Sequence, residues 1–181
     1  MTHRLTQSAI DYRYVDTVLL THTHLDHVAD LPTPAKARLL DGHDTFTVIG
    51  LQGIQNVCDA LFVVDDLAER LTISVREPPA GADPFTIDDL EIERAPTDHS
   101  KPGYEYQFDE QVTTAGDTAP TEPVCSLANG SDVPVHECTY PDGTEAPGHS
   151  TPTALGELFT DVDVDRILLT HLFPRDGTAR R

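Results

Sequence analysis

The stretch His22-Thr23-His24-Leu25-Asp26-His27 (HTHLDH) places three imidazoles and one carboxylate within six residues. In an extended segment the side chains of His22 and His24 face the same way, and Asp26 and His27 follow at a turn. Nitrogen and oxygen ligands of this kind suit Zn²⁺, with Mn²⁺ and Fe²⁺ as alternatives. Four such ligands do not close easily around one ion, so the motif favours two metal ions about 3.5–4 Å apart. A solvated histidine-rich turn is the weaker interpretation.

The motif follows a short apolar run, residues 15–21 (VDTVLLT), which predicts a buried strand. Further polar clusters stand at or just after the ends of later predicted strands and contain His99, Asp117, His136 and His171. The other predicted strands are 45–49, 71–75, 90–95, 104–108, 112–114, 133–137 and 166–170, and the predicted helices are 32–40, 54–61 and 151–159. Loops at one edge of a sheet are where rigid scaffolds present functional groups, so we expect these clusters to serve one site.

The bulk composition limits the class of protein. A chain of 181 residues suits one domain, and it carries no apolar run long enough to span a membrane and no apolar segment typical of a secretory signal, so we expect a cytoplasmic protein. The net charge of -19, from 31 acidic and 12 basic residues, favours a salt-rich cytoplasm over an ordinary acidic protein. It also argues against a basic groove for nucleic acid, although a small phosphorylated substrate held by metal stays open.

Cysteine usage excludes two kinds of site. The three cysteines, Cys58, Cys125 and Cys138, show no CxxC spacing. A disulfide framework or a thiolate zinc site is therefore disfavoured, and we expect three reduced, partly buried thiols.

The ordered motifs resemble those of the metallo-β-lactamase superfamily, whose signature is similar to HTHLDH. Within that superfamily the later segments resemble the ribonuclease Z-like branch. The similar segments are, in order, Thr97-Asp98-His99-Ser100, Ala115-Gly116-Asp117-Thr118, Val135-His136-Glu137-Cys138-Thr139-Tyr140, Gly148-His149-Ser150-Thr151 and Leu169-Thr170-His171-Leu172. The resemblance implies an α/β metallo-β-lactamase fold, a four-layer αββα sandwich, formed by a single domain over residues 1–181.

The resemblance also implies the metal ligands. One ion is held by His22, His24 and His99, and the second by Asp26, His27 and His171. Asp117 bridges the two ions. Two Zn²⁺ ions lower the pKa of a shared water toward about 7 and so provide a bridging hydroxide nucleophile.

Three further residues complete the expected chemistry. Asp26 orients the attacking water or takes its proton. His149 is the candidate proton donor to the leaving group, and Glu137 is the candidate to orient His149. We expect His136 to make a hydrogen bond rather than a metal contact. His3 and His43 are expected at the surface.

Three features depart from the family pattern. Only about twenty residues precede His22, where members begin with several strands, and the chain stops within ten residues of His171. We therefore expect a domain incomplete at its N-terminus, with incompleteness at the C-terminus left open, or a mis-started reading frame. Only seventeen residues lie between His99 and Asp117, where ribonuclease Z proper inserts a long arm that grips transfer RNA.

The leading hypothesis is a dinuclear zinc-dependent hydrolase, a phosphodiesterase acting on small phosphodiesters or cyclic nucleotides. Other small esters remain possible substrates, and RNA is a disfavoured one. We expect no membrane partner, and the formation of a homodimer is left open. Transfer-RNA 3′-end cleavage is one alternative, and an inactive or incomplete fragment is another. Hydrolysis of β-lactams or thioesters is a weaker hypothesis, because the later motifs resemble the ribonuclease Z-like branch.

Overall fold

The computed structural model describes residues 2–81 and 83–173, and its internal contacts divide the chain into two compact units, Met1–Ala80 and Gly81–Arg181. We call them the N-unit and the C-unit. The prediction of one domain over residues 1–181 stays a prediction. Within the described ranges, no helix has both the length and the apolar character needed to cross a membrane.

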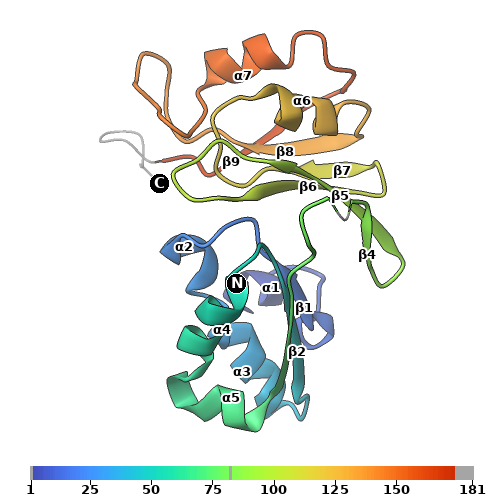
Figure 1. Ribbon diagram of the computed structural model, residues 1–181, viewed down its shortest axis with the longest axis vertical. Helices are drawn as coiled ribbons and strands as arrows, with labels where there is room; N and C mark the ends of the chain where they lie inside the picture. Colours follow the sequence, from blue (N-terminus) through green and yellow to red (C-terminus); the bar gives the residue numbers. More distant parts are fainter. Residues whose placement is uncertain (1, 82, 174–181) are drawn as a thin grey trace. The chain divides into compact units, whose positions relative to one another are not determined.

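The N-unit is a parallel three-stranded sheet with helices along one side (Figure 1). Its strands, in spatial order, are β1 (Thr17–Leu19), β2 (Thr45–Ile49) and β3 (Thr72–Arg76). Its helices are α1 (Thr2–Thr6), α2 (Leu25–Val28), α3 (Pro32–Leu40), α4 (Ile54–Phe62) and α5 (Leu67–Arg70), with 3₁₀ turns η1 (Tyr12–Tyr14) and η2 (Val64–Asp66). Parallel neighbours need crossover connections, which α3 provides before β2, and α4 with α5 before β3.

The core of the N-unit fixes the strand that leads into the HTHLDH motif. Helix α4 buries Ile54, Cys58 and Phe62, which recur every four residues on one helix face. That face packs on β2, where the rings of Phe46 and Phe62 meet with centroids 6.1 Å apart. Leu20, directly before the motif, belongs to the same buried cluster and donates its N–H to the carbonyl of Ile49 at 2.8 Å.

The C-unit is a mixed six-stranded sheet in the order β4-β5-β6-β7-β8-β9. Its elements are β4 (Phe85–Ile87), β5 (Leu90–Pro96), β6 (Tyr104–Phe108), β7 (Val112–Thr114), α6 (Glu122–Ala128), β8 (Val133–Glu137), α7 (Pro152–Leu158) and β9 (Leu168–Thr170). Strand β6 is antiparallel to both β5 and β7, and β8 and β9 run parallel to β7. Strands β5, β7, β8 and β9 therefore share one direction, so the loops that follow them leave the same edge of the sheet.

Two helices, α6 and α7, pack on the sheet that carries that edge. Helix α7 packs an apolar cluster of Ala128, Cys138, Leu155 and Phe159 against the sheet. Helix α6 buries Val124 and Ala128. Polar contacts add to this packing, since Gln107 on β6 donates its side-chain amide to the Leu127 carbonyl at 2.6 Å and to the Ser131 hydroxyl at 3.0 Å. Figure 1 shows α6 and α7 on the same side of the sheet.

Most predicted elements are present with small changes in their bounds. Helix 32–40 and the strands 45–49, 104–108, 112–114 and 133–137 match α3, β2, β6, β7 and β8. The predicted buried strand 15–21 is wrong in extent and burial, because β1 covers only Thr17–Leu19 and is half-buried at the edge of its sheet. Helices α1, α2, α5 and α6 and strand β4 were not predicted. All three cysteines are free, with Cys58 and Cys138 buried and Cys125 half-buried, as predicted.

Candidate metal centre

The N-unit presents one set of candidate ligands on a short loop and one helical turn. His22 is buried just after β1, His24 precedes α2, and Asp26 and His27 lie within α2. The Nε2 atom of His22 lies 3.1 Å from Nδ1 of His24, as the alternation of the motif predicts. His27 stacks obliquely on His22 with ring centroids 4.1 Å apart, and its Nε2 lies 3.5 Å from Asp26. Three imidazoles and one carboxylate are thus gathered within one small segment.

The C-unit presents the second set at the carboxyl ends of β5, β7 and β9. The central group is Asp117, which is buried after β7. One carboxylate oxygen, Oδ2, lies 3.9 Å from Nε2 of His99, and the other, Oδ1, lies 3.4 Å from Nε2 of His171. Each oxygen of Asp117 therefore faces a different imidazole.

The tautomer of His99 is set by Nδ1, the ring nitrogen that does not face Asp117. Nδ1 lies 2.7 Å from the carbonyl oxygen of Gly148, which can only accept a hydrogen bond. Nδ1 therefore carries a proton, and in the neutral ring Nε2 offers its lone pair toward Asp117. Gly148 has φ +71°, and a Cβ at this position would lie 2.9 Å from Nδ1 of His99. A glycine is needed for the carbonyl to approach the ring in this way.

His171 is held in the same tautomer by a different partner, Thr139. The hydroxyl of Thr139 donates to Oε2 of Glu137 at 2.7 Å, because a carboxylate only accepts. Its single proton is thus committed, so it accepts from Nδ1 of His171 at 2.8 Å. The lone pair of His171 is then on Nε2, facing Asp117. His171 itself has φ +55°, an unfavourable conformation for a non-glycine residue that is common at functional sites.

Glu137 joins three of the loops at this edge. The side chain is 1% exposed. Its Oε2 also accepts from the backbone N–H of Thr139 at 2.8 Å. Its Oε1 accepts from the N–H of Ser150 at 2.8 Å and lies 3.4 Å from the N–H of Thr118. One carboxylate thus fixes the loops after β7, after β8 and before α7.

The same carboxylate reaches the candidate proton donor. Nδ1 of His149 lies 3.3 Å from Oε1 of Glu137 and 3.3 Å from the Thr139 hydroxyl. The ring of His149 stacks on that of His171, with centroids 6.0 Å apart and planes 18° from parallel. Ligand atoms of Asp117, His149 and His171 all lie within 4.8 Å of one another, close enough to hold an ion. This carboxylate and imidazole set fits a divalent metal ion.

The remaining histidines lie away from these groups. His136 is fully buried on β8, where its Nδ1 lies 2.7 Å from the carbonyl of Glu137 and its ring meets Phe159 edge-on. Burial lowers the pKa of His136, which favours the neutral ring. The sequence predicts a hydrogen bond rather than a metal contact for His136, and the contact with the Glu137 carbonyl is such a hydrogen bond. His3 and His43 are exposed, as expected.

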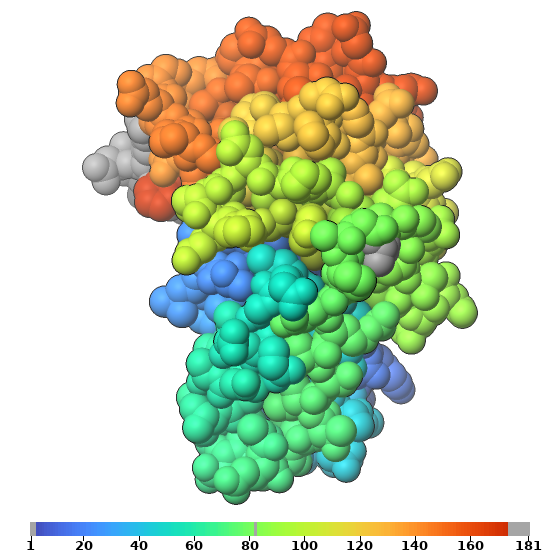
Figure 2. Space-filling view, viewed as in Figure 1, coloured from blue at the N-terminus to red at the C-terminus, as the bar shows by residue number. Residues whose placement is uncertain are grey.

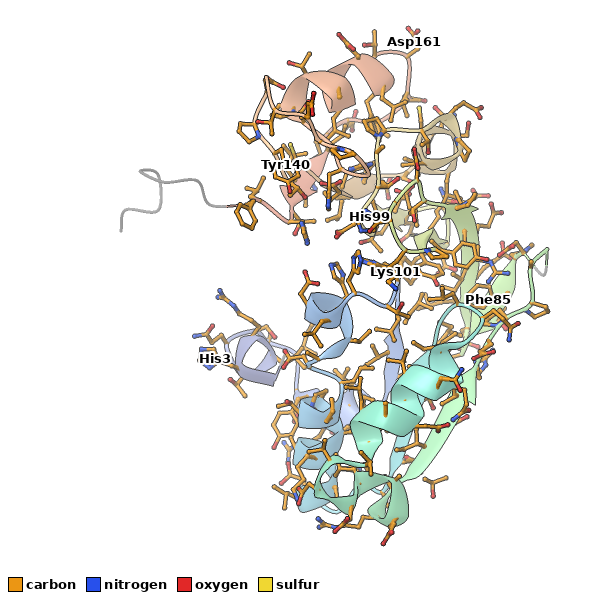
Figure 3. The ribbon with its side chains drawn as sticks, turned by 60° about the vertical axis from the view of Figure 1, so that its left-hand side comes forward. His3, Phe85, His99, Lys101, Tyr140 and Asp161 are labelled. Carbon is orange, nitrogen blue, oxygen red and sulfur yellow. The ribbon has the colours of Figure 1, made fainter. Side chains whose placement is uncertain are left out.

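Sequence reasoning missed two contributors, Thr139 and Gly148. Thr139 was part of a quoted motif but received no role, and Gly148 was quoted only as a neighbour of His149. Their signal lies in three dimensions, because Gly148 and His99 are 49 residues apart. Figure 3 labels His99 on the loop after β5 and Tyr140 on the loop after β8.

Comparisons with known proteins identify the family and the fold. Residues 2–172 match the family model described as Beta-lactamase superfamily domain. A curated relative from Exiguobacterium sibiricum, named Ribonuclease Z, is 24% identical over 230 residues, covering 96% of this chain and 76% of the relative.

Two solved structures share the fold. The metallo-beta-lactamase fold protein YhfI from Bacillus subtilis has a TM-score of 0.79 at 19% identity, covering 96% of this chain and 70% of that one. The short form of human tRNase Z has a TM-score of 0.75 at 19% identity, covering 96% of this chain and 78% of that one. The predicted metallo-β-lactamase fold and its ribonuclease Z-like branch are confirmed.

Proposed function

Because the chain belongs to the beta-lactamase superfamily, as a metal-dependent hydrolase of the ribonuclease Z-like branch, we propose that it is a phosphodiesterase with a dinuclear zinc centre. Its substrates are small phosphodiesters or cyclic nucleotides. The observation that carries the proposal is the arrangement around Asp117. Its two oxygens face two imidazoles, and each ring has committed its only other nitrogen to a neighbour, Gly148 or Thr139.

The proposed ligand sets follow the family motif. His22, His24 and His99 hold one ion, Asp26, His27 and His171 hold the other, and Asp117 is shared. Zinc is the proposed metal, with Mn²⁺ and Fe²⁺ as alternatives. When bound, the ions supply Lewis acidity, which makes water at the site more acidic and offsets the charge that develops on the phosphoryl oxygens.

The chain's own groups handle the protons. Asp26 orients the attacking water and accepts its proton. His149 protonates the leaving oxygen from Nε2, since its Nδ1 faces Glu137 at 3.3 Å. The buried carboxylate of Glu137 fixes the orientation of the His149 ring.

Three observations favour small substrates. The span between His99 and Asp117 is fully described and forms only the β6–β7 hairpin, with no arm. The alignment with the Exiguobacterium sibiricum relative runs over 230 residues, more than the 181 of this chain, so the relative carries insertions that this chain lacks. The net charge of -19 disfavours a long polyanion.

Turnover of bis-p-nitrophenyl phosphate tests the proposal. We expect metal-dependent release of p-nitrophenol and two zinc ions per chain by elemental analysis. Asp26→Ala should reduce kcat at least about 100-fold, the usual scale for losing a proton-transfer group. Asp132→Ala, which removes an exposed carboxylate of the C-unit, is the matched control. Activity that survived both chelation and Asp26→Ala would sink the proposal, and a folded chain without metal would favour an inactive fragment.

Transfer-RNA 3′-end cleavage is the second candidate, because curated relatives that cover 96% and 97% of the chain are named Ribonuclease Z. It requires substrate binding without an arm. A gel assay on a precursor transfer RNA in high salt decides between the two candidates. Cleavage at the 3′ end with a higher kcat/KM than any small diester would replace our first choice.

A salt-rich cytoplasm is the proposed compartment, on the basis of the acidic composition. The proposed partner is a small-molecule substrate, and a homodimer is the proposed alternative to a monomer. Light scattering in molar salt measures the mass directly.

A further inference from the structure

A hollow of about 380 Å³ lies in the C-unit at the ends of β8 and β9. Its wall is almost wholly apolar, and no lining residue carries a charge. The lining includes Thr139, Tyr140, Pro141, Leu169, Leu172 and Phe173. In Figure 2 the last described residues, drawn red, lie next to the orange atoms of the segment before α7.

The hollow shares a wall with the candidate metal centre. Thr139 lines it and places its hydroxyl 2.8 Å from Nδ1 of His171. Tyr140 also lines it, and the Tyr140 ring meets the ring of His149 edge-on with centroids 5.5 Å apart. The hollow is therefore one side chain away from two histidines of the candidate metal centre, through Thr139 and Tyr140.

The hollow also exposes apolar surface that a ligand could cover. Leu172 and Phe173 are each 64% exposed, and Leu169 is 46% exposed. The segment that carries them is nevertheless held, because the N–H of Phe173 donates to the carbonyl of Thr139 at 3.2 Å. The rings of Phe173 and Tyr140 lie 6.4 Å apart between centroids with planes 38° apart, so both contribute aromatic surface to one wall.

We propose that this hollow binds a flat aromatic ring of the substrate, a nucleobase in the case of a nucleotide. The inference rests on the proposed phosphodiesterase function and narrows it to diesters that carry a ring. An uncharged aromatic wall matches such a ring, which gains affinity by stacking and by burying apolar area. In molar salt, ionic attraction to a phosphate is screened, whereas the burial of apolar surface involves no charge that salt could screen. A ring contact is thus the interaction that keeps its strength in the proposed compartment.

Three probes separate the ring from the phosphate: adenosine 5′-phosphate, ribose 5-phosphate and adenosine. Each is titrated into the zinc-saturated full chain by calorimetry and by amide NMR. We expect adenosine 5′-phosphate to bind about tenfold more tightly than ribose 5-phosphate, the usual scale for one stacked base. Adenosine alone should shift the amide signals of Tyr140 and Phe173. Phe173→Ala should abolish the tenfold difference, whereas Val112→Ala, at another exposed apolar residue of the C-unit, should leave it unchanged.

The other outcomes separate the ring-binding hollow from the proposed phosphodiesterase function. Equal affinities for the two phosphates, or a preference that survives Phe173→Ala, overturns the inference while leaving the phosphodiesterase proposal intact. Adenosine shifts that depend on Phe173, with no binding of either phosphate, support the hollow and count against the proposed function. A dimer that dissociates in Phe173→Ala, together with no adenosine shift, means that a second copy of the chain covers the hollow, and it also overturns the inference.

Discussion

Replacing Thr139 by valine should weaken metal binding without reshaping the site. Valine keeps the branched shape of threonine but removes the hydroxyl that accepts from Nδ1 of His171 at 2.8 Å and donates to Glu137 at 2.7 Å. His171 then loses the partner that keeps its lone pair on Nε2. Groups that orient a metal-binding histidine are typically worth 10- to 100-fold in metal affinity.

The structure places the expected loss near the lower end of that range. Glu137 keeps the backbone N–H groups of Thr139 and Ser150, so its carboxylate is not left unsatisfied. The side chain of His171 is 29% exposed, so water replaces part of the lost contact. We therefore expect about a tenfold loss of affinity, or about 1.4 kcal/mol.

The assay is competition for Zn²⁺ against a chromogenic chelator, which needs no turnover. Thr139→Ser is the matched control, because serine keeps the hydroxyl and should bind zinc within about twofold of the wild type. Thr139→Val with wild-type zinc affinity would refute the tautomer argument. So would a serine variant as weak as the valine variant, since the loss would then come from packing.

Three other predictions concern Glu105, the acidic surface and His149. Burial raises the pKa of Glu105 from 4.5 to about 8, so between those pH values the unfolded chain releases a proton that the folded chain keeps. The folded state should therefore lose up to about 1.4 kcal/mol per pH unit as the pH rises from about 4.5 to 8. Urea melts should show this slope in the wild type and in Glu93→Gln, a control at an exposed carboxylate, but not in Glu105→Gln. An unchanged slope in Glu105→Gln would contradict the raised pKa of Glu105. The melting temperature should rise steeply between 0.1 M and 3 M KCl, because the Debye length falls from about 10 Å to below about 3 Å; a flat response contradicts salt adaptation. His149→Ala should cost about 100-fold or more on diesters with an alkoxide leaving group and far less on p-nitrophenyl esters, which leave without protonation. Equal losses on both substrates would remove His149 as the proton donor.

The sequence was sufficient to predict the elements whose structure depends on neighbouring residues. Strand β2 and the β6–β7 hairpin were predicted to the residue, because a short β-branched run or a tight turn specifies them without distant partners. The clustering of the histidines in the HTHLDH segment was equally predictable, since their rings are neighbours in the chain and contact each other directly.

The rest depended on contacts between distant residues. Strand β4 is three residues long and exists by pairing with β5, so its own sequence carries little signal. Helix α6 has seven residues, too few for a clear apolar period. The roles of Thr139 and Gly148 required knowing that their loops meet at one sheet edge. Resemblance to a family supplied the residue list, but not the hydrogen bonds that set each tautomer.

The position of Glu137 has a consequence for anyone who maps this site by substitution. Both of its oxygens receive a backbone N–H, from Thr139 on one side and Ser150 on the other. Glutamine, the usual neutral mimic, must turn its NH₂ group toward one of these donors whichever way the amide is flipped. No isosteric replacement therefore exists at residue 137, and an inactive variant there reports a broken scaffold as readily as a missing chemical step. Mutational surveys that score activity alone would rank Glu137 beside the metal ligands for the wrong reason.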